Sequence, residues 1–370
     1  MPAVVLLGAG SRVGRAIAAA LVADGRAFVA AGSDPATVRE RLASDGLPAA
    51  VLDAVHRAEP ASGAELLTGT GVVVQADARA GSVVLRQAAA AAVAAGVHHL
   101  DVLPDPGHAP AVEAELAATA ADAGVTVLPG VGPDLVPGDA LAALAADAVV
   151  GPREVHVSFA VPSSGGLGAA LTRGGRTAWA RTWLEPGPAF DAGRVVTERI
   201  GEVRRLAWFP RPVGPAHAVG IPGALAWSVP RRVPGVRTVR TYLAMPGWRA
   251  ELVQLTGAAA RRPAVRAWLQ RRLDGRPPAD AATLAEVRWA GVAEARGRDD
   301  EVARAWANGH DPVAVAAAAV AVLVGELVDG RAPAGVHPPT GVLDAATLLD
   351  RLAGRSPLRW SVVRPDAGPR

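Results

Sequence analysis

Residues 3–14 near the start of the chain read Ala-Val-Val-Leu-Leu-Gly-Ala-Gly-Ser-Arg-Val-Gly. The apolar run Ala3–Leu7 is typical of a buried strand, and Val13–Ala23 has the composition of a helix. The glycines between them would let the backbone approach a pyrophosphate closely, which the N–H groups at a helix N-terminus bind well. The spacing is GxGxxxG rather than GxGxxG, so the prediction of a dinucleotide site depends on this strand–loop–helix setting.

The second strand ends where the adenine ribose would bind. Asp34 could hold the ribose hydroxyls of NAD, or it could cap the helix that begins at Pro35. Arg12 or Arg39 could instead bind the 2′-phosphate of NADP, and Ser33 could add a hydrogen bond. We predict NADP as the cofactor, with NAD as the alternative. The predicted cofactor contacts are Gly8, Gly10, Ser11, Arg12, Val13, Gly14, Ser33, Asp34, Gln75 and Ala76.

Strand-like and helix-like segments alternate through residues 1–150. The expected strands continue with Ala27–Ala31, Ala50–Val55, Val72–Gln75, Leu100–Leu103 and Val125–Leu128, and the expected helices include Pro35–Ala43, Val83–Ala95 and Ala111–Ala123. This alternation predicts an α/β Rossmann domain, a doubly wound parallel sheet with helices on both faces.

The pattern changes near Gly151. Residues 151–310 indicate a second α+β domain with a mostly antiparallel sheet, which would bind substrate or mediate dimerisation. Its expected strands are Val155–Val161, Val195–Trp208, Ala224–Val229 and Val236–Leu243, followed by a partly helical Leu252–Leu273 and a hairpin of Leu284–Ala295 with Glu301–Ala307. Residues 311–370 are expected to form C-terminal helices that pack back on the Rossmann domain.

Composition excludes several classes of protein. All 38 basic residues are arginine, so a Schiff-base lysine is impossible, and the absence of cysteine excludes thiol nucleophiles, disulfides and thiolate metal sites. The net charge is only +3 and no long basic run occurs, so nucleic-acid binding is not expected. Without an export signal or an apolar run long enough to span a bilayer, we expect a cytoplasmic protein.

Ligands of an open α/β sheet bind at the carboxyl ends of its strands. Asp101 and His108 follow the fifth predicted strand, and we take them as the candidate catalytic acids. The alternatives are a backbone-fixing hydrogen bond for Asp101 and an exposed loop position for His108. Their loop spacing is not that of a metal site, so no metal is predicted.

Longer segments resemble a known family. The opening Gly8–Ala16, the segment Ala95–Asp101 and the segment Gly124–Asp139 are similar to the saccharopine dehydrogenase-like NAD(P)-binding proteins. Ser163–Gly166 and Ala334–Pro339 fit the same pattern, and the closest likeness is to the trans-acting enoyl reductase-like subgroup of actinobacteria. The resemblance implies a Rossmann domain, an inserted α+β domain and NAD(P)H-dependent reduction.

Three positions depart from that family's pattern. Ser11 replaces a glycine, and Gly32-Ser33 replaces a Gly-Arg whose arginine suits a 2′-phosphate. The fourth strand ends in Gln75–Arg79 where the family has an asparagine followed by Gly-Pro. That loop would border the nicotinamide, so this departure bears directly on the chemistry of the protein.

The main hypothesis is an NAD(P)H-dependent oxidoreductase that reduces a C=C, C=N or C=O bond of a small or medium hydrophobic metabolite. The glycine loop motivates it, together with a second domain for the substrate. The alternative is a non-catalytic dinucleotide-binding sensor or partner subunit, which the altered loop 75–79 motivates. A homodimer is possible in either case.

Overall fold

The structure is a computed structural model. It describes residues 4–58, 64–77, 80–162, 184–245, 262–274 and 281–364, together with 175, 176, 182, 249, 251–253 and 259. The chain forms two compact units. The first comprises Met1–Pro104, His108–Val136 and Val313–Asp344, and the second comprises Asp105–Gly107, Pro137–Pro312 and Ala345–Arg370. The expected C-terminal segment 311–370 is thus divided between the units, with its last part from Ala345 in the second.

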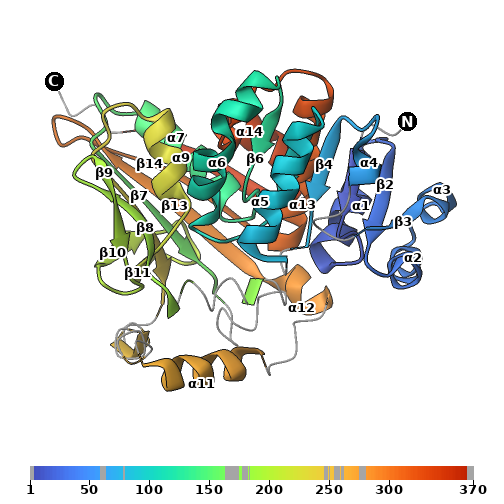
Figure 1. The fold of residues 1–370 in the computed structure, drawn as a ribbon. Helices are drawn as coiled ribbons and strands as arrows, with labels where there is room; N and C mark the ends of the chain where they lie inside the picture. The colour runs from blue at the N-terminus through green and yellow to red at the C-terminus, as the bar shows by residue number, and fades with distance from the viewer. Residues whose placement is uncertain are drawn as a thin grey trace. The chain divides into compact units, whose positions relative to one another are not determined.

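The sheet of the first unit confirms the predicted Rossmann class. In the described residues, its strands run in the order β3-β2-β1-β4-β5-β6-β15 and every pair is parallel. Figure 1 labels β2, β3, β4 and β6 of this sheet. The strands are β1 (Val4–Leu7), β2 (Phe28–Gly32), β3 (Val55–Arg57), β4 (Val72–Gln75), β5 (His98–Asp101), β6 (Thr126–Leu128) and β15 (Gly335–Val336). The order reverses between β1 and β4, which is the topological switch point of a doubly wound sheet.

Helices connect these parallel strands, as their crossover geometry requires. They are α1 (Arg12–Ala23), α2 (Pro35–Ser44), α3 (Ala49–Asp53), α4 (Ala64–Leu67), α5 (Gly81–Ala94) and α6 (His108–Asp122), with α13 (Pro312–Val328) before β15. α13 is buried from Val315 to Leu327, all around its circumference, which explains its continuous apolar sequence.

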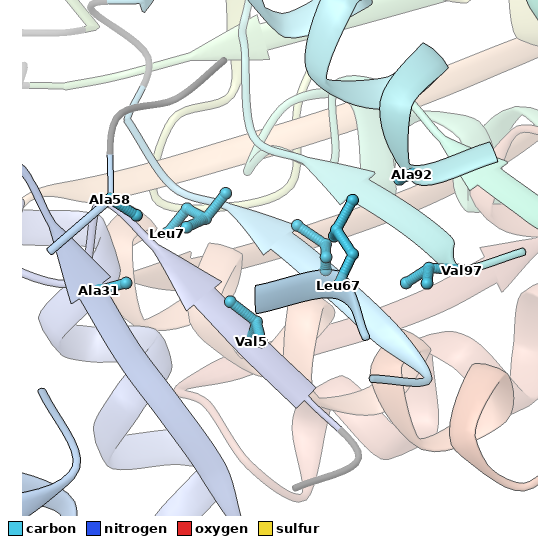
Figure 2. Packing of buried hydrophobic residues seen from close by; sticks show 8 residues of the cluster. Val5, Leu7, Ala31, Ala58, Leu67, Ala92 and Val97 are labelled. Carbon is cyan, nitrogen blue, oxygen red and sulfur yellow. The ribbon is translucent and has the colours of Figure 1, made fainter. Parts of the chain in front are cut away.

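One face of this sheet packs against α4 and α5. Figure 2 shows Val5 and Leu7 of β1 in the same buried cluster as Leu67 of α4 and Ala92 of α5. Side chains of a strand alternate between faces, so Leu6 points to the opposite face, where it is fully buried. Burial on both faces explains why β1 has no polar residue.

The expected strand Ala50–Val55 is wrong. The segment forms the short helix α3, capped by Pro48, and the strand begins only at Val55. A short apolar run does not distinguish helix from strand, and the alanines here favour the helix. The fifth strand is also earlier than expected, at His98–Asp101 rather than Leu100–Leu103.

The second unit contains a mixed, mostly antiparallel sheet, as predicted. Its described strands follow the order β10-β11-β12-β7-β13-β14-β16, with β8 pairing to β12 and β9, and only β12 and β7 run parallel among them. They are β7 (Glu154–Ala160), β8 (Gly187–Asp191), β9 (Arg194–Glu198), β10 (Arg204–Trp208), β11 (Pro215–Ile221), β12 (Thr238–Ala244), β13 (Arg288–Arg296), β14 (Val302–His310) and β16 (Leu358–Val363).

The described helices of this unit include α7 (Leu135–Asp147), which begins in the first unit, α9 (Leu225–Arg232), α11 (Pro263–Asp274), α12 (Ala281–Glu286) and α14 (Ala345–Ala353). Two expectations are wrong here. Ala224–Val229 is helical rather than extended, with Leu225 and Val229 on the buried side of α9. The expected strand Val195–Trp208 is two strands, because the chain turns at Gly201, whose φ of 81° suits glycine.

We predict that Leu100→Ala destabilises the protein by about 2–5 kcal/mol, because Leu100 is completely buried in β5 and its loss leaves a cavity. Urea unfolding of both proteins measures the difference. Val83→Ala is the control, since Val83 is 59% exposed on α5 and its change should cost less than about 0.5 kcal/mol. Equal losses for the two variants would contradict the described packing of β5.

Candidate functional site

The glycine loop lies at the switch point of the first unit's sheet. β1 pairs with β2 on one side and with β4 on the other, so the loop Gly8–Ser11 lies next to the residues that follow β4. At such a point the neighbouring connections run to opposite faces of the sheet and leave a crevice in which dinucleotides bind. The sequence-predicted loop therefore occupies the position that its proposed ligand requires.

Backbone crowding explains two of the loop's glycines. Gly8 has a φ of +73°, and a Cβ there would lie 2.7 Å from the backbone nitrogen of Asp77. A Cβ on Gly14 would overlap the carbonyl oxygen of Gly8. The third glycine, Gly10, meets only a side chain, the Cγ2 atom of Val38 at 3.1 Å. Gly8 thus lets the loop pack against the segment after β4, and Gly14 lets α1 pack against the loop; we call this closely packed loop, Gly8–Gly14, the glycine cradle.

Ser11 joins this cradle to the end of β4. Its side-chain oxygen accepts a hydrogen bond from the Gly14 N–H at 2.9 Å, which caps α1, and its hydroxyl donates to the Ala76 carbonyl at 3.0 Å. The first main-chain bond of α1 runs from the Arg15 N–H to the Ser11 carbonyl. The N–H groups of Arg12 and Val13 precede that bond at the positive end of the helix.

At the end of β2, Asp34 is the cap of α2. Its Oδ1 accepts from the N–H groups of Ala36 and Thr37, and its Oδ2 accepts from the Thr37 hydroxyl at 2.6 Å. The hydrogen bonds from Thr37 lower the pKa of this exposed carboxyl. Ser33 is exposed beside it. The guanidinium of Arg39 donates to the Leu52 carbonyl at 3.0 Å, so this candidate for the 2′-phosphate is held by α3.

A row of residues crosses the sheet at its carboxyl edge. Leu7, Gln75 and Asp101 are register partners on β1, β4 and β5, so their side chains share one face. Gln75 and Asp101 are fully buried, and Ala76 is nearly so, with its N–H donating to the Leu7 carbonyl. The last two residues of the altered loop, Ala78 and Arg79, lie outside the described residues, as does the Ser163–Gly166 segment.

The two candidate catalytic residues, Asp101 at the end of β5 and His108 at the start of α6, lie in contact. The Nε2–H of His108 donates to Asp101 Oδ2 at 2.8 Å. Asp101 Oδ1 accepts from the N–H groups of Leu103 and Gly130, both at 3.0 Å. Burial alone would raise the pKa of Asp101, but the charge and hydrogen bond of His108 lower it below its ordinary value. The alternative of an exposed loop position for His108 is wrong, because His108 begins α6 and is completely buried.

Sequence reasoning missed the residue on the other side of His108. The Ser82 hydroxyl lies 3.0 Å from His108 Nδ1, and Arg86 NH1 donates to Ser82 Oγ at 2.8 Å. Arg86 also pairs with Glu115 of α6 at 2.8 Å. Ser82 is partly exposed near the start of α5, the helix that follows β4. The i, i+4 spacing of Ser82 and Arg86 on a helix was the available signal.

His99 is a second histidine in this buried region. It is completely buried on the same face of β5 as Asp101, and neither ring nitrogen has a hydrogen-bond partner among the described residues. Burial lowers its pKa to about 4, although the charge of Asp101 opposes the shift. His99 is therefore neutral at pH 7, and its imidazole adds no charge beside Asp101.

The described residues contain no cluster of three or more histidine, aspartate or glutamate side chains arranged to hold a metal. They also contain no helix both long enough and apolar enough to cross a membrane.

Comparisons with known proteins relate the chain to a dehydrogenase fold. No family model and no curated protein matches its sequence. Apo saccharopine dehydrogenase (L-Glu forming) from Saccharomyces cerevisiae matches in structure with a TM-score of 0.64 at 14% identity, over 98% of this chain and 100% of that chain. At that identity the match shows a shared fold. It agrees with the fold that the resemblance implied.

Two further structures match less closely. An oxidoreductase domain protein from Kribbella flavida has a TM-score of 0.42 at 15% identity, and levoglucosan dehydrogenase in complex with NADH has a TM-score of 0.42 at 12% identity. Each alignment covers 98% of this chain and 99% of the other.

We predict that the stability of the protein falls as the pH decreases from about 6.5 to 4. The pKa of His99 is lowered in the folded state from 6.5 to about 4, so the unfolded chain binds more protons throughout this window. The full effect is about 3 kcal/mol. Unfolding free energies of the native protein and of His99→Leu, measured across this range, test the prediction.

The variant should show a shallower dependence on pH. Val83→Ala, at an exposed position of α5 without a titrating side chain, is the control and should keep the native dependence. The same pH profile for His99→Leu and the native protein would show that His99 does not titrate as described.

Proposed function

We propose that this protein is an NAD(P)H-dependent oxidoreductase that reduces a C=C, C=N or C=O bond of a small or medium hydrophobic metabolite. The observation that carries the proposal is the glycine cradle at the switch point, where Gly8 and Gly14 admit no side chain. A helix N-terminus and a close backbone approach are what a pyrophosphate needs. The motif resemblance supports a place near the trans-acting enoyl reductase-like subgroup.

The residues of the loop fit a dinucleotide. Gly8 and Gly10 would lie beneath the pyrophosphate, Gly14 would keep α1 packed against the loop, and the N–H groups of Arg12 and Val13 would face the phosphates. Bound there, the reduced nicotinamide would supply a hydride. We propose NADPH ahead of NADH, since the Asp34 carboxylate, which would hold the ribose hydroxyls of NAD, is engaged in capping α2.

The substrate must also receive a proton when a hydride is added. We propose that Asp101 and His108 supply it through Ser82, because both are fully buried and Ser82 is partly exposed. Protonated His108 would donate from Nδ1 to Ser82 Oγ while the Ser82 hydroxyl gives its proton to the substrate. Ionised Asp101 would stabilise the imidazolium at Nε2. The net change is one proton from His108 to substrate, leaving Ser82 unchanged.

The direct test is consumption of NADPH and NADH with ketones, enones and imines. We expect turnover with at least one class. Bound cofactor without turnover in all three classes would contradict a reductase and would favour the non-catalytic dinucleotide-binding protein.

We predict that Gly14→Ala abolishes dinucleotide binding, with at least a 100-fold rise in Kd by fluorescence titration, because the new Cβ would displace the Gly8 carbonyl. Gly10→Ala is the matched control. Its Cβ meets only the Val38 side chain, which can move, so the rise in Kd should be smaller. Native affinity in Gly14→Ala would refute the cradle.

We predict that Ser82→Ala lowers kcat about 10²–10⁴-fold, the usual contribution of a positioned acid, with little change in the Kd of the cofactor. Ser82→Thr keeps a hydroxyl and should recover activity. Full activity in Ser82→Ala would exclude the proposed proton path.

A further inference from the structure

The end of β2 lacks the arginine found there in the family that the sequence resembles. The neighbouring strand β3, however, has an arginine at the same edge of the sheet. β3 runs parallel to β2 with Arg57 as the register partner of Gly32. The Ala58 N–H donates to the Gly32 carbonyl at 3.0 Å, which continues the pairing past Arg57. Arg57 is therefore at the carboxyl edge of the sheet, beside the turn Ser33–Asp34.

The charge of Arg57 acts on this turn. Arg57 is exposed, and its positive charge is one of the causes that lower the pKa of Asp34, after the hydrogen bonds from Thr37 and Ala36. In the described part of the chain, no hydrogen bond from its guanidinium to another residue is found. Its donors are thus available to a ligand at the turn.

A second arginine approaches from α2. Val38 of this helix lies between the two loops, since its Cγ2 atom would be 3.1 Å from a Cβ on Gly10 and 2.9 Å from one on Gly32. Arg41 follows three residues later on the same side of the helix. Its NH1 donates to the Gly10 carbonyl at 3.0 Å, and the residue is exposed. Arg41 therefore lies on the glycine loop at its β2 side.

These positions match the adenine-ribose end of the dinucleotide. In Rossmann domains the ribose lies at the end of the second strand, where an acidic residue binds the 2′-hydroxyl or a nearby arginine binds a 2′-phosphate. The Asp34 carboxylate is turned toward the N–H groups of α2. Two guanidinium groups and the exposed Ser33 hydroxyl then suit a phosphate, which arginine binds through paired N–H groups.

We propose that Arg57 and Arg41 bind the 2′-phosphate of NADPH and set the preference for NADPH over NADH. The inference rests on the proposed function, because it needs the dinucleotide in the cradle. In the family that the sequence resembles, the residue that corresponds to Ser33, after Gly32, binds the 2′-phosphate. Here we assign that role to residues of β3 and α2.

The experiment measures how much the 2′-phosphate contributes to binding, apart from the rest of the cofactor. Calorimetric titration with 2′,5′-ADP and with 5′-AMP compares two adenosine ligands that differ in that phosphate, and fluorescence titration compares NADPH with NADH. Arg57→Gln should weaken the binding of 2′,5′-ADP and NADPH about 10- to 100-fold, as expected for the loss of a charge-assisted hydrogen bond. The affinities for 5′-AMP and NADH should stay within about twofold of the native values. Arg41→Gln should act in the same direction.

Two further variants test whether the effect is specific to Arg57 and Arg41. Arg39→Gln removes a charge from the same helix, but its guanidinium is held against α3 by the Leu52 carbonyl, whereas that of Arg41 is held on the glycine loop. Arg39→Gln should therefore not change the ratio of the two affinities. Arg57→Lys keeps the charge without the paired donors and should recover part of the affinity. These side chains are exposed, so circular dichroism and thermal unfolding should match the native protein.

The two possible failures are distinguishable. If NADH and 5′-AMP bind but both arginine variants keep the native NADPH-to-NADH ratio, the inference is overturned and the proposed function stands. A native protein with no preference for NADPH would overturn it in the same way. If the native protein binds neither dinucleotide, the proposed function fails and this inference fails with it.

Discussion

The first unit depends on a single close approach of backbone to backbone, where the loop after β1 meets the residues after β4. Gly8 permits it because a Cβ there would collide with the main chain of Ala76 and Asp77, which cannot move aside as a side chain can. Gly14 permits the adjoining approach of α1 to Gly8 for the same reason. The parallel order of β1 beside β4 brings the two loops together, and burial of these strands on both faces fixes their register. The pyrophosphate site that we propose at the start of α1 therefore depends on the sheet as much as on the loop.

The buried carboxylate of Asp101 behind this approach is hydrogen-bonded at both of its oxygens. Each Asp101 oxygen accepts at least one hydrogen bond, and His108 links this carboxylate to Ser82 at the start of the helix that follows β4. A buried carboxylate needs such partners because its charge is removed from water. The same bonds join β5, α5 and α6, so one cluster serves both the packing of the unit and the proton path that we propose.

The sequence was sufficient to predict the Rossmann sheet, because its strands are short apolar runs between helices and its glycine loop stands at the right place. It was not sufficient at Ala50–Val55 or Ala224–Val229, where short apolar segments are compatible with either helix or strand. Pairing of Asp101 with His108 was beyond sequence reasoning, since it depends on where α6 begins. The roles of Ser82, Arg41 and Arg57 were missed for the same reason: each depends on a neighbour distant in sequence or on a strand register.

Ser11 has a consequence that reaches beyond its place in the loop. Its side chain accepts a hydrogen bond from the Gly14 N–H and donates one to the Ala76 carbonyl. Opening of the segment after β4 would release the hydroxyl and loosen the first turn of α1, whereas fraying of that turn would free the segment. Amide exchange at a single backbone position, Gly14, would thus follow the motion of a loop some sixty residues away, which makes this glycine a built-in reporter of the crevice.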